Sequence, residues 1–173
     1  MSEAPELPEP GAERSTPEEL LPRYLDFFRS TLLRKIEGLT EQQLRSSLLP
    51  SGWSPLELVW HLRFVERRWL RWGFLAEPVD RPWGDADERG RWTVPEGMTT
   101  AQVVEEFRRE CDRSRALVHG VPLDRRARVG GRFPEEKDAP TLSAILFHLF
   151  QEYARHVGQL DVVRELTDGQ AGE

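Results

Sequence analysis

The strongest constraint on the fold of this chain is a repeated spacing of its apolar residues. In four stretches of roughly 20 residues each, apolar side chains recur every three or four positions, which is the period of an α-helix with one buried face. In the first stretch, for example, Leu21, Leu25, Phe28 and Leu32 follow one another in this way. No stretch of useful length alternates apolar and polar residues as a half-buried strand does. The sequence therefore predicts an all-α fold, a four-helix bundle.

Local signals mark where these helices begin and end. The second stretch begins with Ser54, Pro55 and Glu57, a capping box with proline at the first helical position, and Trp53 and Leu58 flank it as a hydrophobic staple. Threonines begin the other three stretches, and a glycine follows the end of each of them. The expected helices cover approximately residues 16–38, 54–75, 99–120 and 141–168.

The connections between these helices differ in length. Residues 77–98 and 121–140 are long for a bundle, and loops of that length are usually functional or mobile. Residues 1–15 are rich in proline and glutamate, a composition that cannot bury enough apolar surface to become ordered. We therefore expect a flexible N-terminal arm over residues 1–15, a bundle domain over 16–168 and a C-terminal tail over 169–173.

Charge and composition exclude several classes of protein. The net charge of -6 argues against a nucleic-acid binder, which usually has a basic excess. No apolar run approaches the ~20 residues that cross a bilayer, and the N-terminus lacks the basic start and apolar core of a secretory signal. The single cysteine, Cys111, rules out a disulfide within the chain. We expect a cytoplasmic protein that binds neither nucleic acid nor membranes.

Two histidines and one glutamate form the most informative polar group. Glu152 and His156 are four residues apart in the fourth helix, so they lie one turn and about 40° from each other on the same face. At a rise of about 1.5 Å per residue, His61 lies about 10 Å from the start of its helix and His156 about 16 Å from the end of its own. An antiparallel pairing of the two helices would bring all three side chains to a similar level.

This trio has the chemistry of a metal site. Imidazole nitrogen and carboxylate oxygen are ligands that suit a divalent metal, most simply zinc, with nickel or iron as alternatives. Three protein ligands leave one position open for water or a substrate, as in catalytic sites. The competing interpretations are that His61 is a hydrogen-bonded core histidine and that Glu152 forms an ion pair with Arg155 or Arg63.

Other polar residues have a weaker claim to a role. His148, one turn before Glu152, is an alternative ligand, a residue that supports the ligands or a core residue, and we favour the last two. Gln159 either hydrogen-bonds a ligand imidazole or is a surface amide. His119 ends the third helix, where a protonated imidazole suits the helix dipole, and Cys111 is expected to be a small buried side chain.

The loop before the fourth helix is basic, and the loop before the third contains tryptophans. The basic run either receives an anionic group of a substrate or is a solvated loop, which is the interpretation we favour. It lacks the glycine and lysine spacing of a phosphate-binding loop. Two tryptophans are candidates for the mouth of a pocket. The residues concerned are Arg125, Arg126, Arg128, Gly130, Gly131 and Arg132 in the basic run, and Trp83 and Trp92 in the earlier loop.

At these residues the sequence resembles a known superfamily over roughly residues 18–168. Trp53-Ser54-Pro55 leading to His61, followed by Glu152-x3-His156-x-Gly158-Gln159-Leu160, is similar to the DinB-like metal-binding four-helix bundles, including a branch of uncharacterised actinobacterial proteins. A glutamate as the first ligand of the last helix resembles the N-terminal domain of mycothiol-dependent maleylpyruvate isomerase. The resemblance implies that His61, Glu152 and His156 are the metal ligands and that a low-molecular-weight thiol, such as mycothiol or bacillithiol, is a cosubstrate.

These observations lead to one functional hypothesis and two alternatives. The hypothesis is a metal-dependent thiol S-transferase, in which a thiolate attacks a small electrophilic molecule. The first alternative is a non-catalytic metal-binding or stress-associated bundle, and the second is a metal-dependent hydrolase in which the open position activates water. A homodimer formed through an apolar face of the bundle is a further expectation.

Overall fold

A computed structural model describes residues 9–11 and 16–171 of the chain. The expected flexible arm, residues 1–15, lies outside the described residues except for positions 9–11. The last two residues of the expected tail, 172 and 173, also lie outside them.

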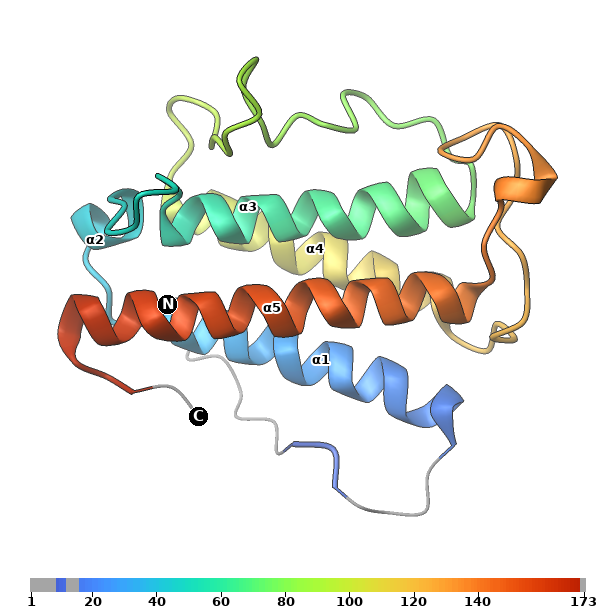
Figure 1. The fold of residues 1–173 in the computed structure, drawn as a ribbon, viewed down its shortest axis with the longest axis horizontal. Coiled ribbons are helices and arrows are strands. Elements are labelled where there is room, and N and C mark those ends of the chain that lie inside the picture. The colour runs from blue at the N-terminus through green and yellow to red at the C-terminus, as the bar shows by residue number, and fades with distance from the viewer. Residues whose placement is uncertain (1–8, 12–15, 172–173) are drawn as a thin grey trace.

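Four long helices form the bundle, as the apolar spacing predicted, and the described residues contain no strand (Figure 1). The second long helix is composed of two segments, α3 and η1. Two short helical turns lie in the connections between the long helices. The elements in chain order are α1 (Pro17–Ile36), α2 (Glu41–Arg45), α3 (Pro55–Glu66), η1 (Arg67–Phe74), α4 (Thr100–Val118), η2 (Glu136–Asp138) and α5 (Leu142–Asp168).

The predicted helix starts are confirmed by the capping interactions. At the start of α3, the Glu57 side chain accepts a hydrogen bond from the backbone N–H of Ser54 at 2.7 Å, and Pro55 occupies the first turn. The same reciprocal arrangement occurs at Thr16 and Thr99. A further capping box at Thr40 begins α2, a short helix that the apolar spacing did not predict.

The second helix differs from the prediction in its C-terminal half. An uninterrupted α-helix to about Leu75 was expected, but residues Arg67–Phe74 form a π-helix. The carbonyl groups at its end are bonded from outside the helix, because Trp72 accepts from the N–H of Arg132 and Phe74 accepts from that of Arg128. The side chains of a π-helix point in different directions from those that a continued α-helix would give. Such segments are frequent near functional sites.

The packing of the helices determines where the candidate site lies. α5 packs mainly on α1, α3 packs mainly on α4, and α3 and α5 also contact each other (Figure 1). The connection from η1 to α4 runs back along the outer side of α3. None of the helices in the described part of the chain is long and apolar enough to cross a membrane.

A buried polar cluster lies within this otherwise apolar core. The Glu66 carboxylate of α3 accepts hydrogen bonds from the Arg29 guanidinium at 2.8 Å and from the Tyr153 hydroxyl at 2.8 Å. The Cys111 sulfur lies 3.9 Å from the same hydroxyl. We call Arg29, Glu66, Tyr153 and Cys111 the core ion cluster. All four side chains are buried, so the charges of Arg29 and Glu66 neutralise each other away from water.

Candidate metal centre

The three residues singled out in the sequence meet between α3 and α5. His61, on α3, and Glu152 and His156, on α5, each have one potential ligand atom within 4.8 Å of those of the other two. Nε2 of His156 lies 3.2 Å from a carboxylate oxygen of Glu152. The imidazole rings of His61 and His156 are 5.2 Å apart and nearly perpendicular. The trio is therefore close enough to bind one ion.

Each imidazole is fixed by an oxygen on the side away from the trio. Nδ1 of His61 donates to Oδ2 of Asp85 at 2.8 Å, and Nδ1 of His156 donates to Oε1 of Gln159 at 2.8 Å. An oxygen that accepts from Nδ1 leaves Nε2 of a neutral imidazole with a free lone pair. Such hydrogen bonds commonly orient histidines that bind metals.

Asp85 was not identified from the sequence. Its carboxylate is buried and is also hydrogen-bonded by Arg68 at 2.6 Å. Burial alone would raise the pKa of Asp85, but the hydrogen bond from His61 and the charge of Arg68 hold it below its usual 3.8. Asp85 lies in the long connection after η1, outside any helical spacing, so the only sequence signal was that this connection is long and contains tryptophans.

The same connection brings an aromatic ring over the trio. The indole of Trp92 stacks on the His61 imidazole, with ring centres 3.9 Å apart, and its ring is also 5.2 Å from that of His156. Trp83, the other tryptophan expected at a pocket mouth, is 57% exposed and lies over the guanidinium of Arg68. Trp92 thus covers one side of His61, whereas Trp83 lies at the surface.

Glu152 lies between two histidines. Its second carboxylate oxygen is 3.1 Å from Nε2 of His148, and the closeness of His156 is the main cause that lowers the pKa of Glu152 below its usual 4.5. The alternative ion pair with Arg155 or Arg63 is wrong for the described residues, because Arg63 pairs with Glu106 at 3.0 Å and no contact joins Glu152 to Arg155. Burial lowers the pKa of His61 below its usual 6.5.

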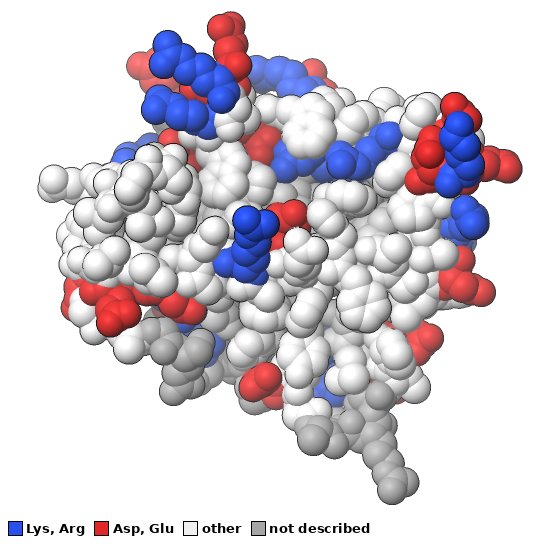
Figure 2. Space-filling view, viewed as in Figure 1, with Lys and Arg blue, Asp and Glu red and all other residues white. Residues whose placement is uncertain are grey.

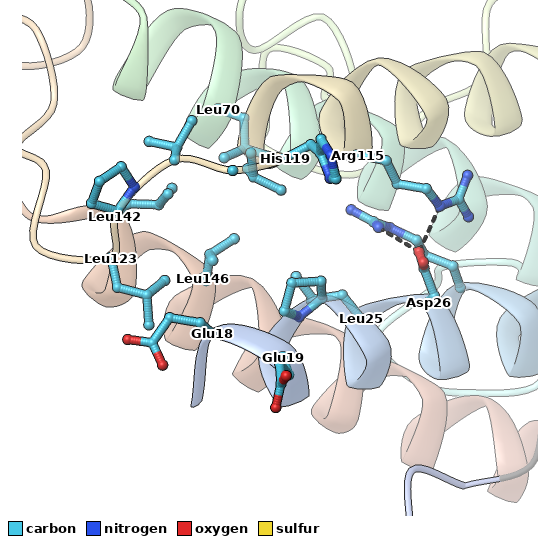
Figure 3. A pocket seen from close by; sticks show the side chains of 16 residues that line it. Glu18, Glu19, Leu25, Asp26, Leu70, Arg115, His119, Leu123, Leu142 and Leu146 are labelled. Atoms are coloured by element: carbon cyan, nitrogen blue, oxygen red, sulfur yellow. Dashed lines mark hydrogen bonds and ion pairs between the residues drawn. The ribbon is translucent and has the colours of Figure 1, made fainter. Parts of the chain in front are cut away.

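The remaining candidates lie away from the trio. His119 is exposed at the end of α4 and lines a separate cavity of about 560 Å³ between α1, α4 and α5. Figure 3 shows Leu70, Leu142 and Leu146 around this cavity and the ion pair of Arg115 with Asp26 at one end. No residue of the trio lines it.

The cysteine and the basic loop are also placed by the structure. Cys111 is buried, as expected, and burial raises the pKa of its thiol. Within the basic run, Arg126 donates to backbone carbonyl groups, whereas the guanidinium of Arg132 lies over the ring of Trp69. Trp69 also contacts the ring of His148, with centres 4.0 Å apart. Ring contacts therefore connect Arg132 to His148, which lies beside Glu152.

Comparison with protein families gives one match over most of the chain. Residues 20–169 match the model of the family described as mycothiol-S-transferase. No protein in a curated set matches at a significant level. The matched range includes all three residues of the trio and every helix of the bundle except the first three residues of α1.

Proposed function

The chain belongs to the mycothiol-S-transferase family, and this membership supports the activity of a thiol transferase. On this premise we propose that His61, Glu152 and His156 bind one divalent metal ion. The proposed reaction joins the sulfur of mycothiol, or of a related low-molecular-weight thiol, to a small electrophile. The observation that carries the proposal is the distance of at most 4.8 Å between the potential ligand atoms of the three side chains.

The donor set fits a transition metal rather than calcium or magnesium. Two imidazole nitrogens and one carboxylate oxygen suit zinc, which we propose as the metal, with nickel or iron as alternatives. The hydrogen bonds from the two Nδ1 atoms to Asp85 and Gln159 support the same assignment, because they direct both Nε2 atoms to the centre.

The protein itself supplies position and shielding. A bound divalent ion would supply the positive charge that favours the thiolate form of the thiol. His148 lies 3.1 Å from one oxygen of Glu152 and helps to position this carboxylate, and Trp92 covers one side of His61. In the overall reaction the thiol loses its proton, its sulfur forms a bond to the electrophilic carbon, and the leaving group departs with the electron pair. Since Cys111 is buried, the thiol has to come from a second substrate.

Metal analysis of the purified protein tests the ligand assignment. We expect close to one divalent metal ion per chain and loss of most of it in His156→Ala, because two ligands without the third bind weakly. His119→Ala is the matched control, since His119 is an exposed histidine outside the trio. Full metal content in His156→Ala would contradict the assignment.

Turnover assays separate the proposed reaction from its alternatives. Electrophile consumption that requires both thiol and metal, and that a chelator stops, supports the transferase. Hydrolysis without any thiol would instead favour a metal-dependent hydrolase. Stoichiometric metal with neither reaction would favour a non-catalytic metal-binding or stress-associated bundle.

We also propose a cytoplasmic location and a homodimer. A single free, buried cysteine suits a reducing compartment, and cell fractionation tests this location. The homodimer is supported by exposed apolar side chains on α5, namely Phe147, Val162 and Leu166. Light scattering during size-exclusion chromatography measures the oligomeric state directly.

A further inference from the structure

The guanidinium of Arg132 is half-buried, yet among residues 9–11 and 16–171 no carboxylate lies within ion-pair distance of it. Two nearby arginines of η1 are neutralised instead. Arg68 pairs with Asp85 at 2.6 Å, and Arg71 pairs with Glu77 at 2.8 Å. A partly desolvated cation without a partner is costly, so a site of this kind favours an incoming anion.

Aromatic rings hold this guanidinium from its faces. Its central carbon lies 4.3 Å from the ring centre of Trp69 and 5.4 Å from that of Trp83. Stacking uses the flat faces of a guanidinium and leaves its N–H groups free to donate within the plane. The five donors of Arg132 thus remain available for a carboxylate, which accepts two parallel hydrogen bonds from such a group.

The backbone beside Arg132 is held firmly against η1. The N–H of Arg132 donates to the carbonyl oxygen of Trp72 at 3.2 Å. A Cβ atom on Gly131 would lie 2.2 Å from that same oxygen, so only glycine permits this approach. The position of the arginine is therefore fixed by the fold rather than by a free loop.

Ring contacts connect Arg132 to the candidate metal centre. Trp69, beneath the guanidinium, lies 4.0 Å from the ring of His148, and His148 contacts Glu152 at 3.1 Å. In Figure 2, which views the face formed by α3 and α5, basic atoms form a row among uncharged atoms near α3, whereas most acidic atoms lie towards the edges of the view. Arg132, Trp69 and His148 thus form a wall that leads from the surface to Glu152.

We propose that Arg132 binds an anionic group, most simply a carboxylate, carried by a substrate of this site. The inference rests on the proposed function, because it assumes a substrate that reacts at the trio. Arg132 would bind the anionic group of that substrate while its reactive atom lies at the trio. Burial and the nearby charge of Arg68 both lower the pKa of Arg132, which agrees with a cation that lacks a partner.

A binding experiment tests the inference without relying on turnover. Benzoate and benzamide have the same shape and differ in charge, and tryptophan fluorescence of the metal-replete protein reports their binding. We expect tighter binding of benzoate, weakened roughly tenfold to a hundredfold in Arg132→Met, which is the effect of one lost charge-assisted hydrogen-bond pair. Arg132→Lys should retain part of the affinity, because lysine keeps the charge but not the planar fork.

The control for this experiment is Arg128→Met, an exposed arginine of the same loop, which should bind benzoate as the wild type does. Equal affinities for benzoate and benzamide in the wild type would overturn the inference, and so would unchanged benzoate affinity in Arg132→Met.

Kinetic measurements identify the substrate that carries the anion. The electrophile pair is para-bromomethylbenzoate and para-bromomethylbenzamide, in which the thiol sulfur displaces bromide from the benzylic carbon and the thiol proton is released to solvent. The thiol pair is mercaptoacetate and mercaptoacetamide. Preference for the charged member of either pair, measured as a ratio of kcat/KM and lost in Arg132→Met, assigns the anion to that substrate. Absence of turnover with both electrophiles and with every thiol, mycothiol included, would contradict the proposed function, whereas benzoate binding would still decide the role of Arg132.

Discussion

Two polar clusters both include residues of α3 and α5, and they are organised in opposite ways. In the core ion cluster, Glu66 and Tyr153 lie deep between the helices, and Glu66 has no exposed surface. At the candidate metal centre, His61 and Glu152 lie on the same two helices but are only partly buried. The core ion cluster is closed to solvent, whereas the candidate metal centre is partly exposed and is covered on one side by Trp92 of the connection between η1 and α4.

The difference lies in what each cluster leaves unsatisfied. Arg29 supplies the charge that neutralises Glu66 inside the core ion cluster, although the Oε2 atom of Glu66 has no hydrogen-bond partner among the described residues. At the candidate metal centre, two imidazoles and one carboxylate bring their potential ligand atoms within 4.8 Å of one another, an arrangement that a bound cation would stabilise. The comparison indicates that the core ion cluster serves stability, and it supports the proposal that the trio binds a metal.

Removal of the Glu66 charge should have the largest effect on stability. Glu66→Gln leaves Arg29 buried with only Asp26 as a charged partner, and breaking a buried pair in this way typically costs about 3–5 kcal/mol. We expect the free energy of unfolding to fall by that amount in chemical denaturation. Glu105→Gln removes an exposed glutamate paired with Arg109 and is the matched control. A loss in Glu66→Gln no larger than in this control would contradict the contrast between the clusters.

Replacement of Asp85 should weaken metal binding, in addition to breaking its buried ion pair with Arg68. Asp85→Asn keeps the size of the side chain but weakens the hydrogen bond from His61, and loss of such a supporting partner typically lowers metal affinity by about 10–100-fold. Competition with a chelator of known affinity measures the change. Asp80→Asn, an exposed aspartate of the same connection, should bind metal normally. If the two variants bind metal equally well, Asp85 does not support the site.

The two clusters should also differ in their response to pH, a smaller effect. Burial, opposed by the hydrogen bond with Asp85, holds the pKa of His61 below 6.5, so this imidazole is mostly neutral at pH 7. Metal binding requires the neutral form, and affinity should therefore decline only as the pH falls below 6.5 through that depressed pKa. Metal titrations at a series of pH values measure this dependence.

The core ion cluster provides the internal comparison for that experiment. Burial alone would lower the pKa of Arg29, but the charge of Glu66 keeps it above its usual value, and burial raises the pKa of Tyr153. Neither group titrates near neutral pH, so neither contributes to a change in stability there. A metal affinity that already falls steeply above pH 6.5 would mean that His61 is protonated more easily than its surroundings indicate.

The sequence predicted the bundle because helical spacing and capping residues are local signals. Ser54 and Glu57 are only three residues apart, and they determine where α3 begins. The π-helix could not be predicted in the same way, because the carbonyl groups of Trp72 and Phe74 bond a loop more than 50 residues further along the chain. Such contacts depend on the completed fold.

The candidate site was accessible to sequence reasoning for a similar reason. Glu152 and His156 share a helix face. The distances of His61 and His156 from the ends of their helices predicted that the two histidines lie at a similar level in an antiparallel pair. Asp85 could not be predicted, because it lies in a loop and the spacing of residues does not define the path of a loop. Glu66 could not be predicted either, because nothing in the sequence distinguishes it from the other charged residues of its helix. That the trio binds a metal stays a prediction. Helical spacing alone was nevertheless sufficient to predict that these three side chains lie close together.

The burial of Cys111 has a consequence for the lifetime of the protein. Molecules that alkylate a thiol also damage cysteines at protein surfaces, and the risk is highest where such molecules gather. Here the only thiol of the chain is enclosed behind Tyr153, and its raised pKa keeps it in the unreactive protonated form. A protein built in this way can meet reactive compounds repeatedly without inactivating itself.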